Sequence, residues 1–229
     1  MRHETTIRPL GWAFMLSLFA GLGHAQAPVP VDGPKPALAA ADSVVYQLGP
    51  GSRLQVKTGK AGVFGFAGHN HLIESHAVHG VVVYYPRDPA HSHLEITVDA
   101  DSLQVLTPPD TAEIRKVGET MRTEVLRTAD YPVIRLVSRE VQLTGGGFHL
   151  VGAMTLVGQT RTVPFDVVTR IEGDTLEATS TFSLKQTDFG IKPFQGGPGG
   201  TVKVADRVTI QVTAVGIREE PSGSTTAGR

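Results

Sequence analysis

The amino-acid sequence predicts an all-β domain of antiparallel strands with one amphipathic helical segment. Apolar and polar residues alternate with period two along several runs, which is typical of strands with one buried and one solvated face. Clusters of glycine, proline, asparagine and aspartate separate these runs at short spacing. Short strands joined by tight turns indicate a sandwich or a barrel, here of about eight or nine strands.

Each expected strand places a set of apolar or small side chains on one face. The sets are Leu54 and Val56; Leu94, Ile96, Val98 and Ala100; Phe148, Leu150, Gly152, Met154 and Leu156; Val163, Phe165 and Val167; Leu176, Ala178, Ser180, Phe182 and Leu184; and Val208, Ile210, Val212 and Ala214. Turn sequences such as LGPG, YPRDP, TGGG and VGQT lie between the runs. The sets therefore predict the residues that face the interior.

Residues 110–131 depart from this pattern and predict a helix. Its apolar stripe consists of Ile114, Val117, Met121 and Val125. Asp110 follows two prolines and suits the N-cap, and Glu113 completes a capping-box pattern. Gly118 weakens or kinks the segment, which leaves open one helix or two short ones. We expect the stripe to pack against the core and to cover a side or an open end of the sheet.

The composition excludes several classes of function. Lys and Arg number 21 against 22 Asp and Glu, so the chain lacks the clustered positive charge that nucleic acids require. There is no phosphate-binding glycine loop, no G-x-S-x-G nucleophile motif and no zinc-protease helix motif. The chain has no cysteine, so packing alone must hold the fold together.

The ends of the chain predict export and a single folded domain. Residues 1–27 have a weakly basic start, the apolar run LGWAFMLSLFAGLG and an Ala-Gln-Ala site, which together are typical of a signal peptide. Residues 28–43 form a Pro/Ala-rich linker, 44–217 the β-domain, and 218–229 a polar, disordered tail. No later segment approaches the length of a membrane span. We expect a periplasmic protein.

The stretch GHNHLIESHAVHG concentrates histidines and raises two alternatives. His69 and His71, two residues apart, would lie on one face of a strand, where both imidazoles could share a metal ion. His91 and His93 form a second such pair, and we expect a metal set of His69, His71 and His93 if the pairs meet at one barrel mouth. The alternative is a polar rim that hydrogen-bonds a ligand head group and depends on pH.

One amide side chain, one carboxylate and two further histidines complete this region. Asn70 and Glu74 could form hydrogen bonds to the metal-ligating side chains without contacting the metal themselves. His76 and His79 are an odd number of residues apart, so on one strand they face opposite sides. No carboxylate is paired by spacing with a nucleophile, so the sequence contains no candidate catalytic residues.

Apolar side chains on the inward faces either fill a core or line a cavity, and periodicity cannot separate these alternatives. The candidate ligand-binding residues are Phe64, Phe66, His69, His71, Leu94, Ile96, Met154, Phe165 and Phe182, with Leu54, Val56, Leu156 and Ile210 as further apolar candidates. Arg115 and Arg122 on the helical segment are weaker candidates for head-group contact, since a solvated helix face explains them as well.

The order of these features resembles the YceI-like family over about residues 44–215. The stretches that carry the resemblance are YQLGPGSRLQVKT, HLIESHAVHGVVVY, ITVDADSL with Ser102, VLRTADYPVIRLVS, VGAMTLVGQTRTVPFDV and LKQTDFGI. No single motif is diagnostic, but the ordered set is specific. The Gly-His-Asn-His form departs from the family's single-histidine pattern, in which His71 would be the counterpart.

The resemblance implies an eight-stranded, lipocalin-like antiparallel barrel with one helix and a long apolar cavity. It implies binding of a polyisoprenoid or quinone-like lipid, without a required cofactor and without enzymatic activity. The alternative function is a periplasmic metal-binding protein that uses the His69/His71 cluster. The sequence leaves open whether the protein is a monomer or a homodimer.

If residues 1–27 form a cleaved leader, the exported protein should begin near Gln26 or Pro28. N-terminal sequencing or intact-mass measurement of protein from the periplasmic fraction checks this. Exported protein that retains Met1 would contradict cleavage.

Overall fold

The computed structural model describes residues 43–61, 70–107, 111–196 and 202–220, which all belong to one unit of the chain. These residues form a 12-stranded sheet in which all strand pairs are antiparallel. The strands are β1 (Val44–Leu48), β2 (Arg53–Ala61), β3 (Leu72–Ser75), β4 (Val78–Tyr84), β5 (His93–Asp99), β6 (Gln104–Val105), β7 (Val133–Thr144), β8 (Gly147–Leu156), β9 (Gln159–Glu172), β10 (Thr175–Lys185), β11 (Gln195–Gly196) and β12 (Val202–Arg218).

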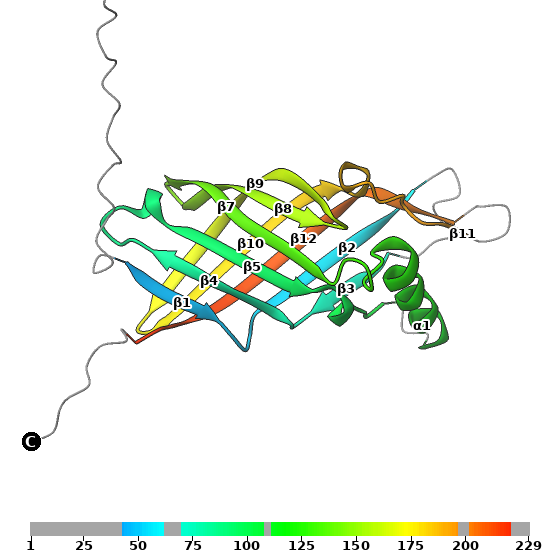
Figure 1. Ribbon diagram of the computed structural model, residues 1–229, viewed down its shortest axis with the longest axis horizontal. Helices are drawn as coiled ribbons and strands as arrows, with labels where there is room; N and C mark the ends of the chain where they lie inside the picture. Colours follow the sequence, from blue (N-terminus) through cyan, green and yellow to red (C-terminus); the bar gives the residue numbers. More distant parts are fainter. Residues whose placement is uncertain (1–42, 62–69, 108–110, 197–201, 221–229) are drawn as a thin grey trace, which may run out of the picture. The chain divides into compact units, whose positions relative to one another are not determined.

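The sheet closes on itself as a barrel (Figure 1). Neighbouring strands follow the order β1-β4-β5-β7-β8-β9-β10-β12, and β12 pairs with β1 to complete an eight-stranded ring. The first part of β12 pairs with β2 instead, and β3 and β6 continue the sheet beyond β2. The predicted eight-stranded antiparallel barrel is therefore confirmed.

A helical segment covers the end of the barrel at which β2 finishes and β3 begins (Figure 1). Helix α1 (Thr111–Thr120) continues directly into a π-helical turn, η5 (Met121–Val125). Met121 is buried, and Ile114, Val117 and Val125 are half-buried against the core, as the apolar stripe predicted. The helix passes through Gly118 without a break, and the irregularity begins only at Met121. Asp110 lies outside the described residues.

Three strand irregularities each contain a buried serine whose hydroxyl replaces main-chain pairing. At the bend between β1 and β2, the Ser52 hydroxyl accepts from the Val215 amide at 2.9 Å and donates to the Val215 carbonyl at 3.2 Å. The bulge in β7 begins at Ser138, whose hydroxyl accepts from the Leu94 amide at 2.9 Å and contacts the Leu94 carbonyl at 3.5 Å. Each hydroxyl thus acts as both acceptor and donor for one residue of the adjacent strand.

The third serine joins the break between β3 and β4 to the short helical turn at 100–102. The Ser75 hydroxyl accepts from the Ala77 amide at 3.0 Å and lies 2.6 Å from the Ser102 hydroxyl. Ser102 donates to the Asp99 carbonyl at 2.5 Å, so Ser75 donates to Ser102 in the bond between them. The side chains of Ser52, Ser75 and Ser138 are all buried, and their hydroxyl groups accept from the main-chain amides of Val215, Ala77 and Leu94.

The inward faces of the strands match the sets predicted from the alternation. Buried members include Leu54, Val98, Leu150, Phe165 and Ile210. Val168 and Ile171 on β9 and Leu143 on β7 are instead exposed apolar side chains. Within the described residues, no helix has the length and apolar character that crossing a membrane would require.

We expect Ser52→Ala to lower the free energy of unfolding by about 1–3 kcal/mol, because the buried Val215 amide loses its partner. Urea unfolding followed by circular dichroism measures this. Ser183→Ala is the matched control, since Ser183 lies on the exposed face of β10. Equal midpoints for the two variants would contradict a role of the Ser52 hydroxyl in closing the barrel.

Candidate functional site

The larger cavity lies in the half of the barrel next to α1, and we call it the α1-end cavity. Its volume is about 130 Å³. It is lined by Leu54, Val56, Thr58, Ile73, Val78, Ile96, Val98, Leu103, Met121, Val125, Leu126, Ile134, Leu136, Met154, Leu156, Phe182, Leu184, Gln186, Ile191, Val208, Ile210 and Val212. Strands from around the barrel and the η5 turn therefore contribute to a nearly continuous apolar wall.

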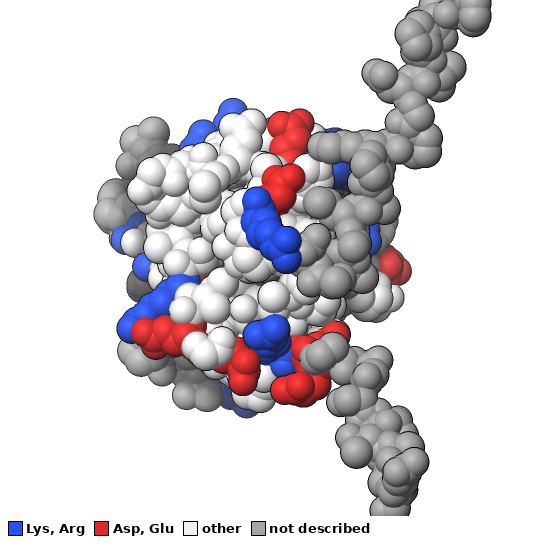
Figure 2. All heavy atoms as spheres, turned by 90° about the vertical axis from the view of Figure 1, so that its left-hand side faces the viewer, with Lys and Arg blue, Asp and Glu red and all other residues white. Residues whose placement is uncertain are grey.

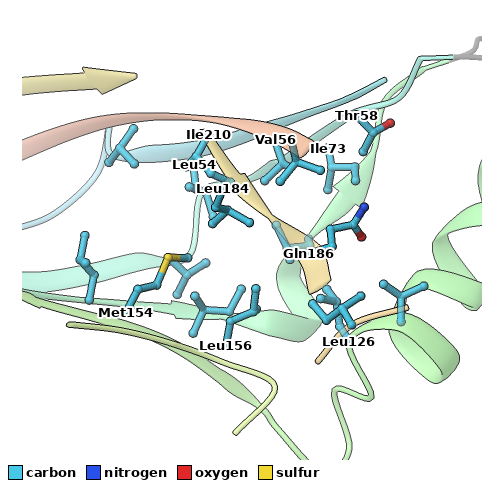
Figure 3. Close-up of a pocket in the computed structure, with 18 of the residues that line it drawn as sticks. Leu54, Val56, Thr58, Ile73, Leu126, Met154, Leu156, Leu184, Gln186 and Ile210 are labelled. Carbon is cyan, nitrogen blue, oxygen red and sulfur yellow. The ribbon is translucent and has the colours of Figure 1, made fainter. Parts of the chain in front are cut away.

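Two polar side chains, Thr58 and Gln186, are part of this wall, and both lie on the side nearest α1 (Figure 3). The Thr58 hydroxyl accepts from the His71 amide at 3.1 Å. The Gln186 side-chain amide donates to the Ala205 carbonyl at 2.9 Å. Among the described residues, the lining contains no carboxylate, imidazole, amine or guanidinium group. Such a wall can hold an apolar group by excluding water, but it offers no acid, base or nucleophile.

The η5 turn closes one side of the α1-end cavity with Met121, Val125 and Leu126. The amide of Leu126 donates to the Met121 carbonyl at 2.8 Å, which is the longer-range bond of a π-helical turn. After the turn, Arg127 has a φ of 49°, and its guanidinium lies 4.7 Å from the centre of the Tyr131 ring. Thr128, which follows the turn, is buried, and its hydroxyl donates to Asp101 at 3.2 Å.

The sequence QTDFGI builds another part of the wall. Phe189 is buried and ends a 3₁₀ turn (Gln186–Phe189), and Gly190 follows with a φ of 72°, a conformation that favours glycine. The main-chain amide and hydroxyl of Thr187 donate to Asp206, and these hydrogen bonds lower the pKa of the Asp206 carboxyl. The turn is thereby fixed to β12, which places Gln186 and Ile191 in the cavity wall.

A smaller cavity of about 60 Å³ lies toward the opposite end of the barrel, and we call it the far-end cavity. It is lined by Val82, Tyr84, Ser92, His93, Leu94, Val141, Phe148, Leu150, Val167, Thr169, Ile171, Leu176 and Ala178. Figure 2 shows this end of the barrel, where basic and acidic side chains are intermixed. Among the described residues there, Arg170 pairs with Glu172 and His91 with Asp88. This mixture of charges gives no single-signed field to attract a charged ligand.

The structure divides the apolar candidates from the sequence among three locations. The α1-end cavity is lined by Leu54, Val56, Ile96, Met154, Leu156, Phe182 and Ile210. Leu94 lines the far-end cavity, and Phe165 lines neither. Phe64 and Phe66 lie outside the described residues. The expectation of one long cavity is corrected for this part of the chain, because the α1-end and far-end cavities share no lining residue.

His71 has a structural set of contacts at the α1 end. Its ring Nδ1 lies 2.8 Å from the Thr107 carbonyl, which can only accept, so Nδ1 carries the proton. Its main-chain amide donates to Thr58, and the amide of the next residue, Leu72, donates to the Thr107 hydroxyl at 2.8 Å. His71 therefore ties the start of β3 to β2 and to the chain after β6.

The histidine pairs do not meet at one barrel mouth. His71 precedes β3 at the α1 end, whereas His91 and His93 lie at the opposite end, before β5 and at its start. The expected convergence of His71 and His93 on one metal is therefore wrong, because the full length of the paired strands separates them. His93 instead contributes to the wall of the far-end cavity. His69 lies outside the described residues.

The other polar candidates are engaged on the outer surface. Glu74 accepts from Gln55 at 2.6 Å and pairs with exposed His76 at 2.8 Å, and these contacts, led by that with Gln55, lower the pKa of Glu74. Arg122 lies 3.8 Å from Asp101, and Arg115 is exposed. Across 43–61, 70–107, 111–196 and 202–220, no group of three or more metal-ligating side chains is close enough to hold an ion.

The cavity residues that sequence reasoning missed include Leu126, Gln186 and Ile191. Each lies in a turn or an irregular segment, where alternation gives no signal. The resemblance pointed to LKQTDFGI as an element of the fold, but not to the inward position of its glutamine. The π-helical geometry that brings Leu126 to the cavity also has no counterpart in the periodic pattern.

Comparison with known proteins decides the family. The model of the YceI-like domain matches residues 51–215. The chain belongs to the YceI-like family. The match covers every strand from β2 to β11 and most of β12, and it includes all the residues that line the two cavities.

Solved structures share the fold of this YceI-like protein. BcnA of Burkholderia cenocepacia is 19% identical, with a TM-score of 0.56 over 71% of this chain and 95% of BcnA. A polyisoprenoid binding domain from Saccharophagus degradans, implicated in plant cell wall breakdown, is 12% identical, with a TM-score of 0.55 over 76% of this chain and 98% of that domain. The search of curated proteins found no match.

We expect His71→Ala to lower the free energy of unfolding by about 1 kcal/mol, because the hydrogen bond to Thr107 is lost. His76→Ala is the control, since this histidine is exposed and its ion pair contributes little. Chemical unfolding of both variants makes the comparison. A His71 variant as stable as the parent would contradict the structural role of this imidazole.

Proposed function

We propose that this YceI-like protein binds an apolar chain of the isoprenoid type inside its barrel and performs no chemistry on it. The observation that carries the proposal is the α1-end cavity, whose wall is apolar except for Thr58 and Gln186. Burial of apolar area contributes about 25 cal/mol per Å², so this wall favours a hydrocarbon over any charged or strongly polar ligand. The polyisoprenoid binding domain of the same fold supports the choice of isoprenoid.

The size of the cavity limits what it holds. A cavity of about 150 Å³ lined by leucine, isoleucine and phenylalanine stays dry and accepts a molecule of the size of benzene. The α1-end cavity is slightly smaller, at about 130 Å³. By that comparison it accommodates about one isoprene unit of five carbons. The remainder of a bound molecule then extends toward the barrel end near α1.

The orientation of the ligand follows from the two polar wall residues. Thr58 and Gln186 lie on the α1 side, whereas Leu54, Met154 and Ile210 form the inner wall (Figure 3). A hydroxyl, phosphate or quinone head group placed in the inner region would lose its water without gaining a partner. We therefore propose that the head group lies at the α1 end, with the hydrocarbon inward. His69 and the imidazole of His71 remain candidates for head-group contact.

We also propose that the protein acts in the periplasm. The support is the leader-like sequence of residues 1–27 and the absence of cysteine, which makes the fold independent of redox conditions. Binding rather than catalysis is supported by the lack of any carboxylate, amine or guanidinium group among the described residues that line the two cavities; the polar side chains of the far-end lining are those of Tyr84, Ser92, His93 and Thr169. A lipid carrier or buffer fits these properties.

Phe182→Trp provides a direct test. The mature chain lacks tryptophan if the leader, which contains Trp12, is removed. We expect the new indole to emit at short wavelength and to change saturably when farnesol is added, because residue 182 lines the cavity. Val168→Trp, on the exposed face of the neighbouring strand β9, is the control and should not respond. A Phe182→Trp emission unaffected by farnesol would overturn the proposal.

A further inference from the structure

A layer of small side chains separates the two cavities. On four strands, one inward residue lies between a neighbour that lines the α1-end cavity and a neighbour that lines the far-end cavity. These residues are Gly80 between Val78 and Val82, Ser138 between Leu136 and Val141, Gly152 between Met154 and Leu150, and Ser180 between Phe182 and Ala178. Side chains this small do not by themselves fill the cross-section of a barrel.

The ring of Phe165 occupies this layer. Phe165 is buried, and its ring centre lies 5.3 Å from that of Phe182 in the α1-end cavity wall. A Cβ added at Gly152 would lie 3.0 Å from Cε1 of Phe165 and 2.8 Å from Cδ1 of Leu136. The glycine therefore leaves the space into which the ring extends, and the next inward residue of β9, Val167, already lines the far-end cavity.

The polar groups of the layer are directed to the main chain. The Ser180 hydroxyl donates to the Asp166 carbonyl at 2.7 Å, and Ser138 exchanges hydrogen bonds with Leu94. Neither hydroxyl depends on a partner inside the barrel. With the aromatic ring absent, a hydrocarbon chain could cross the layer without burying an unsatisfied polar group. The ring is thus the barrier between two apolar spaces that are otherwise compatible with a single ligand.

We propose that Phe165 is a specificity-determining residue that limits the length of the apolar chain that the barrel holds. This inference rests on the proposed function. A chain that enters from the α1 end extends inward past Phe182 until it meets the Phe165 ring. A smaller side chain at position 165 joins the α1-end and far-end cavities, so the barrel accepts additional isoprene units.

Competition among prenyl alcohols of different length tests this role. The full mature chain is incubated with an equimolar mixture of alcohols of two, three, four and eight isoprene units, and bound adducts are quantified by native mass spectrometry. We expect the parent to carry the two- and three-unit alcohols. In Phe165→Ala, the ratio of long to short adducts should rise by at least about tenfold, because each further buried unit adds apolar contact.

Two further variants keep the test decisive. Phe165→Leu retains an apolar side chain and replaces the alanine variant if that variant does not fold. We expect it to raise the ratio of long to short adducts as well. Tyr46→Leu is the matched control, because Tyr46 on β1 is a buried aromatic residue that lines neither cavity, and its length profile should equal that of the parent.

The outcomes separate this inference from the proposed function. A parent that binds the short alcohols, together with Phe165 variants of unchanged length profile, would overturn the inference alone. A parent that binds the eight-unit alcohol as well as the short ones would do the same. A parent without any prenyl adduct would overturn the proposed function, and the role of Phe165 in ligand length with it.

Discussion

The barrel depends on hydrogen bonding of the main chain at the places where its strands bend or break. A closed sheet has no free edge, but β12 changes partners from β2 to β1, β3 is interrupted before β4, and β7 contains a bulge. At each of these places a buried serine hydroxyl satisfies main-chain groups of a neighbouring strand or of the chain next to the break. Without Ser52, Ser75 and Ser138, unpaired amides would be buried next to an apolar interior, at a cost that a chain without disulfides has little means to offset.

This arrangement explains why the interior is so apolar. Four polar side chains of the barrel wall, those of Thr58, Ser138, Ser180 and Gln186, each bond to a main-chain atom. What remains in the α1-end cavity is a hydrocarbon surface suited to a hydrocarbon ligand. Ser138, which bonds to Leu94 at the bulge of β7, also belongs to the layer of small residues between the two cavities. Fold closure and ligand length are therefore linked through one layer of the barrel.

Most of the fold could be predicted because its main signal is local. Alternation identified the inward faces of β2, β5, β8, β9, β10 and β12, and helical spacing identified α1. The candidate site was harder to predict from the sequence. Met154 and Phe182 line the α1-end cavity and Phe165 does not, yet all three have the same apolar character and the same alternation in the sequence. Whether such a side chain lines a cavity or packs in the core depends on its contacts with side chains of strands that are far apart in the chain.

The sequence by itself determined most of the long strands, their buried faces, the helical segment and the family, because period, turn chemistry and the order of motifs are properties of neighbouring residues. Only the tertiary structure decided the position of the histidines and the division of the interior. His71 and His93 lie at opposite ends because paired strands carry the chain along the barrel between them. The ring of Phe165 lies next to Gly152 of β8 and Phe182 of β10 only because the sheet places these strands on either side of β9.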